Sequence, residues 1–342
     1  MRCRGAVSAL AAVFVAVGST VGAGAVAAQA PVTQRVVVVD GSRAEVTSVQ
    51  GRQVMVRIHS AAMGRDVEVK VQRPADISVP RPSLYLVNGA GGGEDTATWE
   101  ENTDVVDFLA DKPVNVVMPI GGAWSYYTDW REPDPMLGVN KWRTFFLDEL
   151  PALVDTLFAT TGRNAIAANS MSVTSILQLA IAKPGLYRSV AAYSGCAQIS
   201  DPIGRQFVNL VVATGGGDAS NMYGPPGDPA WAANDPVVNA EGLRGTRLYI
   251  SNSNGLPGEH DRLGDPHLVT WGPVGLANQV VVGGVIEAAT NWCTKNLQDR
   301  LVELDIPATF DLSTRGTHSW GYWQKAFKNS WPLLAEGMAV PA

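Results

Sequence analysis

The stretch that most constrains the fold runs from residue 165 to residue 176 and has a serine, Ser170, at its centre. Five apolar or small residues precede the serine, and apolar residues recur with helical spacing after it, as far as Leu179. This pattern predicts a strand, a sharp turn and a helix, with the serine at the bend. Such a turn needs small residues two positions before and two after the serine, and here they are Ala168 and Ser172 rather than two glycines. Two interpretations stand: a nucleophile on a strained turn, or a serine that caps an ordinary helix.

The rest of the chain alternates apolar strands with amphipathic helices. Expected strands are residues 83–88, 114–118, 165–169, 189–193, 246–251 and 309–312, and expected helices are residues 142–158, a segment directly after Ser170, 275–304 and 320–334. The Gly- and Pro-rich residues 214–231 are expected to form a long loop. Earlier in the chain, residues 53–58 and 66–71 alternate apolar and polar side chains, which predicts an antiparallel hairpin. The order indicates an α/β fold, with a mostly parallel central sheet covered by helices on both faces.

Composition and the N-terminus set the wider class. The chain has 342 residues and a net charge of −6, which argues against a nucleic-acid partner and leaves ample material for a large core. A basic start with Arg2 and Arg4, an uncharged apolar run and a small-x-small sequence at 28–30 predict a secretory signal over residues 1–30. An uncleaved membrane anchor is the alternative. We expect residues 31–342 to form a single catalytic domain, secreted or held in the cell envelope.

The exported part of the chain keeps two cysteines, Cys196 and Cys293. In an oxidising compartment they either pair as a disulfide or remain as two buried thiols. Two cysteines with scattered histidines do not make a zinc-binding pattern, so no metal is expected, and no organic cofactor is suggested.

A serine nucleophile needs a histidine base that is held in the correct tautomer by a carboxylate. In sheets of this type the three residues follow the order serine, acid, histidine. His318 follows the last expected strand and is the best-placed base, whereas His59 precedes the serine. The loop after strand 246–251 offers two acids, Glu259 and Asp261, and chain order does not choose between them.

A reaction through a tetrahedral intermediate also needs two backbone N–H donors for the oxyanion. The residue after the nucleophile, Met171, is one expected donor. The other is expected from the glycine-rich loop that follows Asn88, at Ala90, where glycines let the backbone approach the substrate. A phosphate-binding function of Gly91-Gly92-Gly93 is disfavoured because no G-K-[ST] sequence follows.

Several longer motifs resemble the antigen 85 family of mycolyltransferases of mycobacteria and their corynebacterial relatives. The likeness covers about residues 63–331, and its motifs are Met63-Gly64-Arg65-Asp66, Val117 to Gly122 with Tyr127-Thr128-Asp129-Trp130, Ser170-Met171, Met222 to Pro225 with Asp228 to Trp231, Asn234-Asp235-Pro236, Asn254 to Glu259, and Gly316 to Trp320 with Tyr322-Trp323. The resemblance implies an α/β-hydrolase fold. It also implies transfer of a mycolyl chain from a trehalose monomycolate to another trehalose ester, or to cell-wall arabinogalactan, through an acyl-serine.

Carried over by motif, the resemblance makes Ser170 the nucleophile, Glu259 the acid and His318 the base, with oxyanion donors at Ala90 and Met171. Trp320 lies in the histidine motif and is expected to line the sugar site. By the same resemblance, Asn88 and Gly91 are the other expected substrate-binding positions. The family usually has Asp-Gly-Leu-Arg where this chain has Asn88-Gly89-Ala90-Gly91, so the carboxylate and guanidinium that face trehalose are missing there. The cysteine pair that many members have after the Asp129-Trp130 region is absent too.

Three functions follow as hypotheses. The first is an exported acyltransferase that builds mycolate-type envelope lipids, with trehalose mycolates and arabinogalactan as substrates. The second is a secreted carboxylesterase that passes the acyl group to water. The third is an envelope-binding homologue without activity, against which the presence of all three triad residue types argues.

Overall fold

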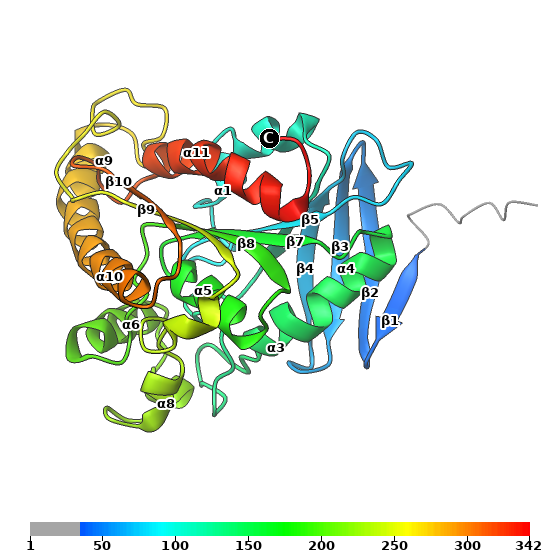
Figure 1. Ribbon diagram of the computed structural model, residues 1–342, viewed down its shortest axis with the longest axis horizontal. Helices are drawn as coiled ribbons and strands as arrows, with labels where there is room; N and C mark the ends of the chain where they lie inside the picture. Colours follow the sequence, from blue (N-terminus) through cyan, green and yellow to red (C-terminus); the bar gives the residue numbers. More distant parts are fainter. Residues whose placement is uncertain (1–34) are drawn as a thin grey trace, which may run out of the picture. The chain divides into compact units, whose positions relative to one another are not determined.

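A single ten-stranded sheet organises the computed structural model, which describes residues 35–342 (Figure 1). The spatial order is β1-β2-β3-β4-β6-β5-β7-β8-β9-β10. The strands are β1 Val36–Val39, β2 Ser42–Gln50, β3 Gln53–Ser60, β4 Arg65–Gln72, β5 Ser83–Val87, β6 Asn115–Ile120, β7 Asn164–Asn169, β8 Tyr187–Tyr193, β9 Arg247–Asn252 and β10 Thr309–Leu312. The expected signal segment, residues 1–30, lies outside the described residues.

The sheet has an antiparallel part and a parallel part. Strands β1 to β4 pair antiparallel, and β4 also pairs antiparallel with β6. From β6 through β5, β7, β8 and β9 to β10, each neighbouring pair is parallel. The expected hairpin is β3 and β4, in the register Gln53 opposite Gln72. β5 and β7 are buried along their whole length, as parallel strands covered on both faces must be.

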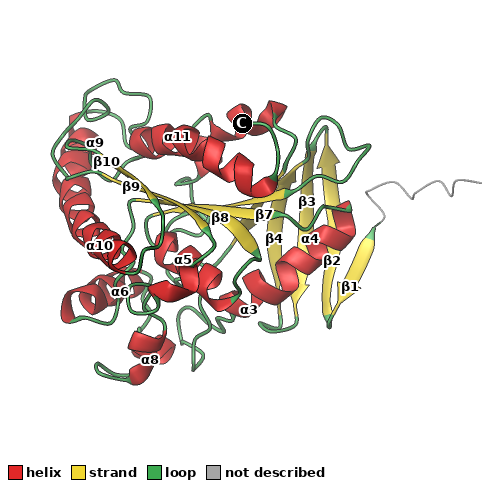
Figure 2. Cartoon of the chain, viewed as in Figure 1, coloured by secondary structure: helices red, strands yellow, loops and turns green. Residues whose placement is uncertain are grey.

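Helices cover both faces of the sheet (Figure 2). On one face lie α3 Trp142–Thr144, η3 Phe145–Glu149, α4 Leu150–Phe158 and α5 Ser172–Ala182. On the other lie α1 Trp99–Asn102, α2 Val105–Phe108 with η2 Leu109–Asp111, and α11 Trp320–Met338. The buried residues form two hydrophobic clusters, one under each helical layer. The mixed sheet with helices on both faces confirms the expected fold class.

The remaining elements lie in the two long connections from β8 to β9 and from β9 to β10. They are α6 Pro202–Thr214, α7 Ser220–Tyr223, α8 Pro229–Ala233, η4 Ala240–Leu243, α9 Pro273–Asn278, η5 Gln279–Gly283 and α10 Gly284–Glu303. Residues 214–231, expected as a loop, contain the short helices α7 and α8. Asp201 caps the N-terminus of α6 and accepts from the N–H groups of Ile203 and Gly204. Within residues 35–342, no helix has both the length and the apolar character needed to cross a bilayer.

Candidate active site

Ser170 lies in a strained turn between β7 and α5. Its φ of +57° is in the left-handed region that non-glycine residues seldom adopt. The turn is held by the Ser170 N–H, which donates to Tyr193 O at 2.9 Å, and by the Val173 N–H, which donates to Ser170 O at 3.1 Å. Ala168 and Ser172 are fully buried on either side, so larger residues have no room there. The serine therefore adopts a nucleophile-elbow conformation although both glycines of the usual motif are missing.

His318 stands directly opposite this turn. Its Nε2 lies 2.9 Å from Ser170 Oγ. The residue belongs to the loop between β10 and α11, and its N–H donates to Gly283 O at 3.2 Å. The ring of Trp323 packs edge-on against the imidazole with centroids 4.9 Å apart, and only 9% of the His318 side chain is exposed. The structure thus brings together Ser170 and His318, 148 residues apart in the chain.

The carboxylate that contacts His318 is Glu287, on α10. Glu287 Oε2 lies 3.0 Å from His318 Nδ1. Its other oxygen, Oε1, accepts from Ser194 Oγ at 2.8 Å and from the Ser253 N–H at 2.7 Å. Glu287 is completely buried, and a buried carboxylate needs such partners to offset lost hydration. Two neutral donors and one imidazole meet that need.

The expectation that Glu259 is the acid is corrected by this geometry. Glu259 lies on the surface, with 58% of its side chain exposed, and its Oε1 accepts from Lys325 Nζ at 2.7 Å. The hydrogen bond from Lys325, followed by the charge of that ammonium, lowers the pKa of Glu259. Chain order placed the acid in the loop after β9, but the carboxylate that reaches the histidine comes from α10, further along the chain.

Asp261, the alternative acid, organises the histidine loop from the side. Its Oδ1 accepts from Thr317 Oγ1 and from Gln279 Nε2. Its Oδ2 accepts from the Gly258 N–H and from Tyr322 Oη, both at 2.7 Å. Burial, followed by the bond to Asp261, raises the pKa of Tyr322, so this phenol remains a donor at neutral pH. Asp261 therefore anchors the residue that precedes His318.

The loop after β5 lies against the nucleophile. Ser172 Oγ donates to Asn88 O at 2.5 Å, which ties the loop to the first residue of α5. A Cβ on Gly89 would lie 3.3 Å from Ser170 Cβ, so the two backbones approach closely. Within the described chain, the N–H groups of Ala90 and Met171 donate to no backbone carbonyl outside the regular elements. Among residues 35–342, these two N–H groups are therefore left without such a backbone partner, and their role as oxyanion donors stays a prediction.

The three expected substrate-binding residues differ in burial: Gly91 is partly exposed in this loop, whereas Asn88 and Trp320 are buried. Asn88 is buried, and its Oδ1 accepts from the Trp99 N–H at 3.0 Å, which holds the start of α1. Trp320 is only 4% exposed and packs edge-on against Trp99 and Trp323. Both side chains are held by packing contacts, and Asn88 also lines a cavity of about 180 Å³ beside Trp99. The expectation that these positions face a sugar stays a prediction.

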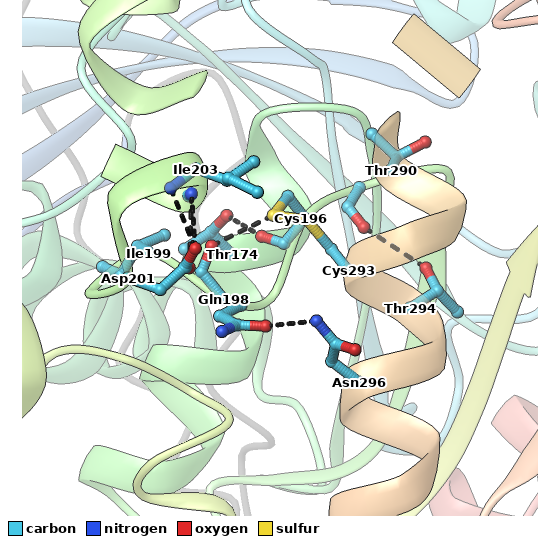
Figure 3. Close-up of a disulfide and its surroundings, with 12 residues drawn as sticks. Thr174, Cys196, Gln198, Ile199, Asp201, Ile203, Thr290, Cys293, Thr294 and Asn296 are labelled. Atoms are coloured by element: carbon cyan, nitrogen blue, oxygen red, sulfur yellow. Dashed lines mark hydrogen bonds between the residues drawn. A yellow bond between two sulfur atoms is a disulfide. The ribbon is translucent and has the colours of Figure 1, made fainter. Parts of the chain in front are cut away.

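Cys196 and Cys293 form a disulfide (Figure 3). It joins the segment after β8 to α10, which also carries Glu287 six residues before the cysteine. Hydrogen bonds reinforce the junction on both sides: Thr174 Oγ1 donates to Cys196 O, and Asn296 Nδ2 donates to Gln198 Oε1 at 2.6 Å. The helix that bears Glu287 is thereby fixed covalently to the segment that follows β8, the strand next to β7.

A cavity of about 490 Å³ lies next to two hydrogen-bond partners of Glu287. Its lining includes Ser194 and Ser253, which both bond Glu287, together with Trp323. Neither Ser170 nor His318 lines it. The cavity therefore adjoins partners of the Glu287 carboxylate, and the surface carboxylate of Glu259 is among its lining residues.

The three side chains form one continuous relay from carboxylate to imidazole to hydroxyl. A hydroxyl bonded to Nε2 can lose its proton to the imidazole as it attacks a carbonyl, and the carboxylate at Nδ1 stabilises the resulting imidazolium. The arrangement is suited to acyl transfer from an ester, with the product decided by the group that attacks the acyl-serine.

Comparison with known proteins agrees with this chemistry. Residues 60–334 match the family described as "Putative esterase". The chain is 32% identical over 308 residues to "Diacylglycerol acyltransferase/mycolyltransferase Ag85A" of Mycobacterium leprae, covering 87% of this chain and 88% of that protein. It is 31% identical over 295 residues to the corresponding Ag85B of the same organism, covering 84% of each.

Among solved structures, the fold resembles MPT51 (FbpC1) of Mycobacterium tuberculosis, with a TM-score of 0.66 and 23% identity over 82% of this chain and 96% of that one. An S-formylglutathione hydrolase from Agrobacterium tumefaciens gives a TM-score of 0.61 and 17% identity, over 86% of this chain and 99% of the other. At these identities the two matches establish the fold, which is that of α/β-hydrolase-like esterases.

Proposed function

Since this chain belongs to the antigen 85 family of acyltransferases and esterases, we propose that it moves mycolyl-type acyl chains between trehalose esters or onto cell-wall arabinogalactan. One observation supports the proposal above the others: the Glu287–His318–Ser170 relay, at 3.0 and 2.9 Å, in a chain 32% identical to proteins named mycolyltransferases.

In the first half-reaction, Ser170 Oγ attacks the ester carbonyl of the donor while His318 Nε2 accepts the hydroxyl proton. Glu287 keeps the other proton on Nδ1 and stabilises the imidazolium. The N–H groups of Ala90 and Met171 receive the charge that develops on the carbonyl oxygen. When the intermediate collapses, the carbon–oxygen bond to the sugar breaks, and His318 returns the proton to the departing sugar hydroxyl.

In the second half-reaction, a hydroxyl of the acceptor replaces the departed sugar. His318 takes the proton of the acceptor hydroxyl while the acceptor oxygen attacks the carbonyl of the acyl-serine. When this second intermediate collapses, the bond from the carbonyl carbon to Ser170 Oγ breaks, and His318 returns the proton to Ser170 Oγ. Water at the same position would give free acid, so transfer requires that water be kept from the acyl-serine. The Asn88-Gly89-Ala90-Gly91 loop lacks the carboxylate and guanidinium of the usual family motif. The identity of the acceptor is therefore the first thing that the experiment below must distinguish.

The decisive experiment supplies trehalose monomycolate and follows three products. Formation of dimycolate is expected for the purified protein and supports transfer. Free mycolic acid without dimycolate would replace transferase with carboxylesterase. No turnover, with no labelling of Ser170 by a serine-reactive phosphonate, would leave an envelope-binding homologue without activity. The matched control is Ser170→Ala, which should give neither product nor label.

The proposed place of action is the secreted or cell-envelope compartment. Residues 1–30 support it, because their basic start, apolar run and small-x-small sequence are typical of a secretory signal. A disulfide between Cys196 and Cys293 agrees with an oxidising compartment. Detection of the mature chain in the culture medium or envelope fraction, with an N-terminus near residue 31, would support this assignment, and a cytoplasmic full-length chain would contradict it.

A further inference from the structure

Three metal-ligating side chains that the acyl-transfer mechanism does not use meet in the segment between β9 and α9. They are His260, Asp265 and His267, and one ligand atom from each lies within 4.8 Å of the other two. The rings of His260 and His267 are perpendicular, with centroids 5.4 Å apart. Asp265 is 1% exposed, which is rare for an aspartate on a surface loop.

The spacing within this cluster fits a small tetrahedral cation. His260 Nδ1 lies 3.2 Å from Asp265 Oδ2. Two ligands bound to one Zn²⁺ at about 2.0 Å in tetrahedral geometry are roughly 3.3 Å apart. The two atoms therefore already lie at the separation that a shared zinc ion would impose. A hydrogen bond between them gives the same distance, so this spacing alone does not distinguish a zinc site from a hydrogen-bonded pair.

That evidence comes from the orientation of the second imidazole. His267 Nδ1 lies 3.0 Å from Asn102 O, at the end of α1. Since a carbonyl only accepts, Nδ1 is the donor, and in the neutral imidazole Nε2 is then the nitrogen with a free lone pair. Metal-binding histidines are typically oriented in this way, with the other ring nitrogen donating to a backbone carbonyl.

The surroundings hold the remaining ligands equally firmly. Asp265 Oδ1 accepts from the His267 N–H at 3.0 Å, which leaves Oδ2 for His260. The His260 ring packs edge-on against Tyr322, with centroids 5.0 Å apart, and a Cβ on Gly321 would lie 2.4 Å from its Cγ. The cluster thus rests on α1 at one side and on the first turn of α11 at the other.

The local charge leaves the buried carboxylate incompletely compensated. Arg262 Nε is 3.7 Å from Asp265 Oδ2, but 73% of the Arg262 side chain is exposed, so it is free to swing into water. Glu259, whose Oε1 is 3.8 Å from His260 Nε2, is paired with Lys325. A divalent cation among the three side chains would bring positive charge directly to Asp265, which otherwise bonds only the His260 ring and the His267 backbone N–H in this cluster.

We propose that His260, Asp265 and His267 bind Zn²⁺, with water completing the coordination, and that the ion fastens the 253–272 segment to α1 and α11. Two imidazoles and a carboxylate are a ligand set that zinc favours. The site is separate from Ser170, so its existence is tested without reference to acyl transfer.

The test uses tag-free mature protein, stripped of metal by chelator and dialysis, and titrated with Co²⁺ as a visible probe and then with Zn²⁺. One equivalent of Co²⁺ should give the intense absorption of a tetrahedral site, and Zn²⁺ should displace it and raise Tm. Loss of an outer partner alone costs about 10–100-fold in metal affinity, so Asp265→Asn and His267→Gln should each cost at least about 100-fold. Absence of stoichiometric binding in the wild-type protein would overturn the proposal.

His59→Gln is the matched control, because His59 pairs with Asp66 at 2.9 Å on the surface without a third ligand. It should bind Co²⁺ like the wild-type protein. If the site variants fail to fold, imidazole NMR of the wild-type protein with Zn²⁺ decides the question. Shifts confined to His260 and His267 support the site, whereas shifts at His318 or His59 instead, or at none of the four, contradict it.

Discussion

The Glu287 carboxylate lies 3.0 Å from Nδ1 of His318, and the two residues reach each other from different elements. Glu287 comes from the first turns of α10, and His318 from the loop before α11. Two further bonds fix the carboxylate from behind, from Ser194 Oγ and the Ser253 N–H. This contact, rather than the surface pair of Glu259 and Lys325, completes the relay to Ser170.

Replacement of Glu287 by Gln should lower kcat by at least about 10³-fold with little change in KM. An amide cannot stabilise the imidazolium, and it permits the wrong histidine tautomer. Steady-state kinetics on a chromogenic ester measure the effect. Glu259→Gln is the matched control, since that carboxylate lies on the surface, and its kcat should stay within about twofold of wild type. The reverse pattern would restore Glu259 as the acid.

The overall fold could be predicted because its strands and helices have strong periodicity. Residues 309–312 form β10 at the expected bounds, and residues 142–158 form the helical run α3–η3–α4. β1 was not anticipated, because an edge strand of four valines, partly exposed, has no alternation. β2 was not anticipated either, since only its first half alternates, and its last four residues are exposed.

Within the site, the nucleophile and base could be predicted, but the acid could not. Ser170 and His318 each follow a strand that the sequence marks clearly, so position along the chain identifies them. Glu287 lies inside a helix, where a charged residue is usually expected on the solvent-exposed side. The available signal was its setting, a single acid among small and apolar residues in Val280 to Ala289. Trp320 is buried among other aromatic rings, and sequence alone does not distinguish such a residue from one that stacks on a sugar.

Ser172→Ala should lower kcat by roughly 10-fold. The hydroxyl of Ser172 holds Asn88 O and so fixes the loop that supplies the Ala90 N–H, and a misplaced oxyanion donor weakens transition-state binding. Ser189→Ala is the control, because the buried Ser189 Oγ donates to Leu334 O near the amino end of β8, at the opposite edge of the sheet from that loop. Both variants should lose about 1 kcal/mol of unfolding free energy. Equal kcat values in the two variants would argue against a role for Ser172 in the oxyanion loop.

Asp261→Ala should lower kcat by about 10–100-fold while KM changes little, because the loss of its bonds frees Thr317 and shifts the neighbouring His318. The rate of Ser170 labelling by a phosphonate should fall in parallel. Asp228→Ala is a suitable comparison: Asp228 caps α8 and pairs with Arg131, and its removal should leave kcat unchanged. A wild-type kcat and labelling rate in Asp261→Ala would contradict the claim that Asp261 positions His318.

Loss of the disulfide through paired Cys196→Ser and Cys293→Ser changes should destabilise the fold by about 2–4 kcal/mol. The bond joins residues 97 positions apart, and release of so long a loop increases the entropy of the unfolded chain. Denaturant unfolding gives the difference, with the reduced wild-type protein as a second measure. We also expect a lower kcat, since α10 presents Glu287. Unchanged stability in the double variant would contradict a stapling role.

The central claim is that the acyl group passes through Ser170, activated by His318 and Glu287. The most direct measurement is peptide mass spectrometry after rapid quenching of the protein with an acyl donor. We predict one acyl adduct on Ser170 in the wild-type protein, much slower accumulation in Glu287→Gln, and no adduct in Ser170→Ala. Turnover without any adduct on Ser170, or an adduct that persists in Ser170→Ala, would contradict the account.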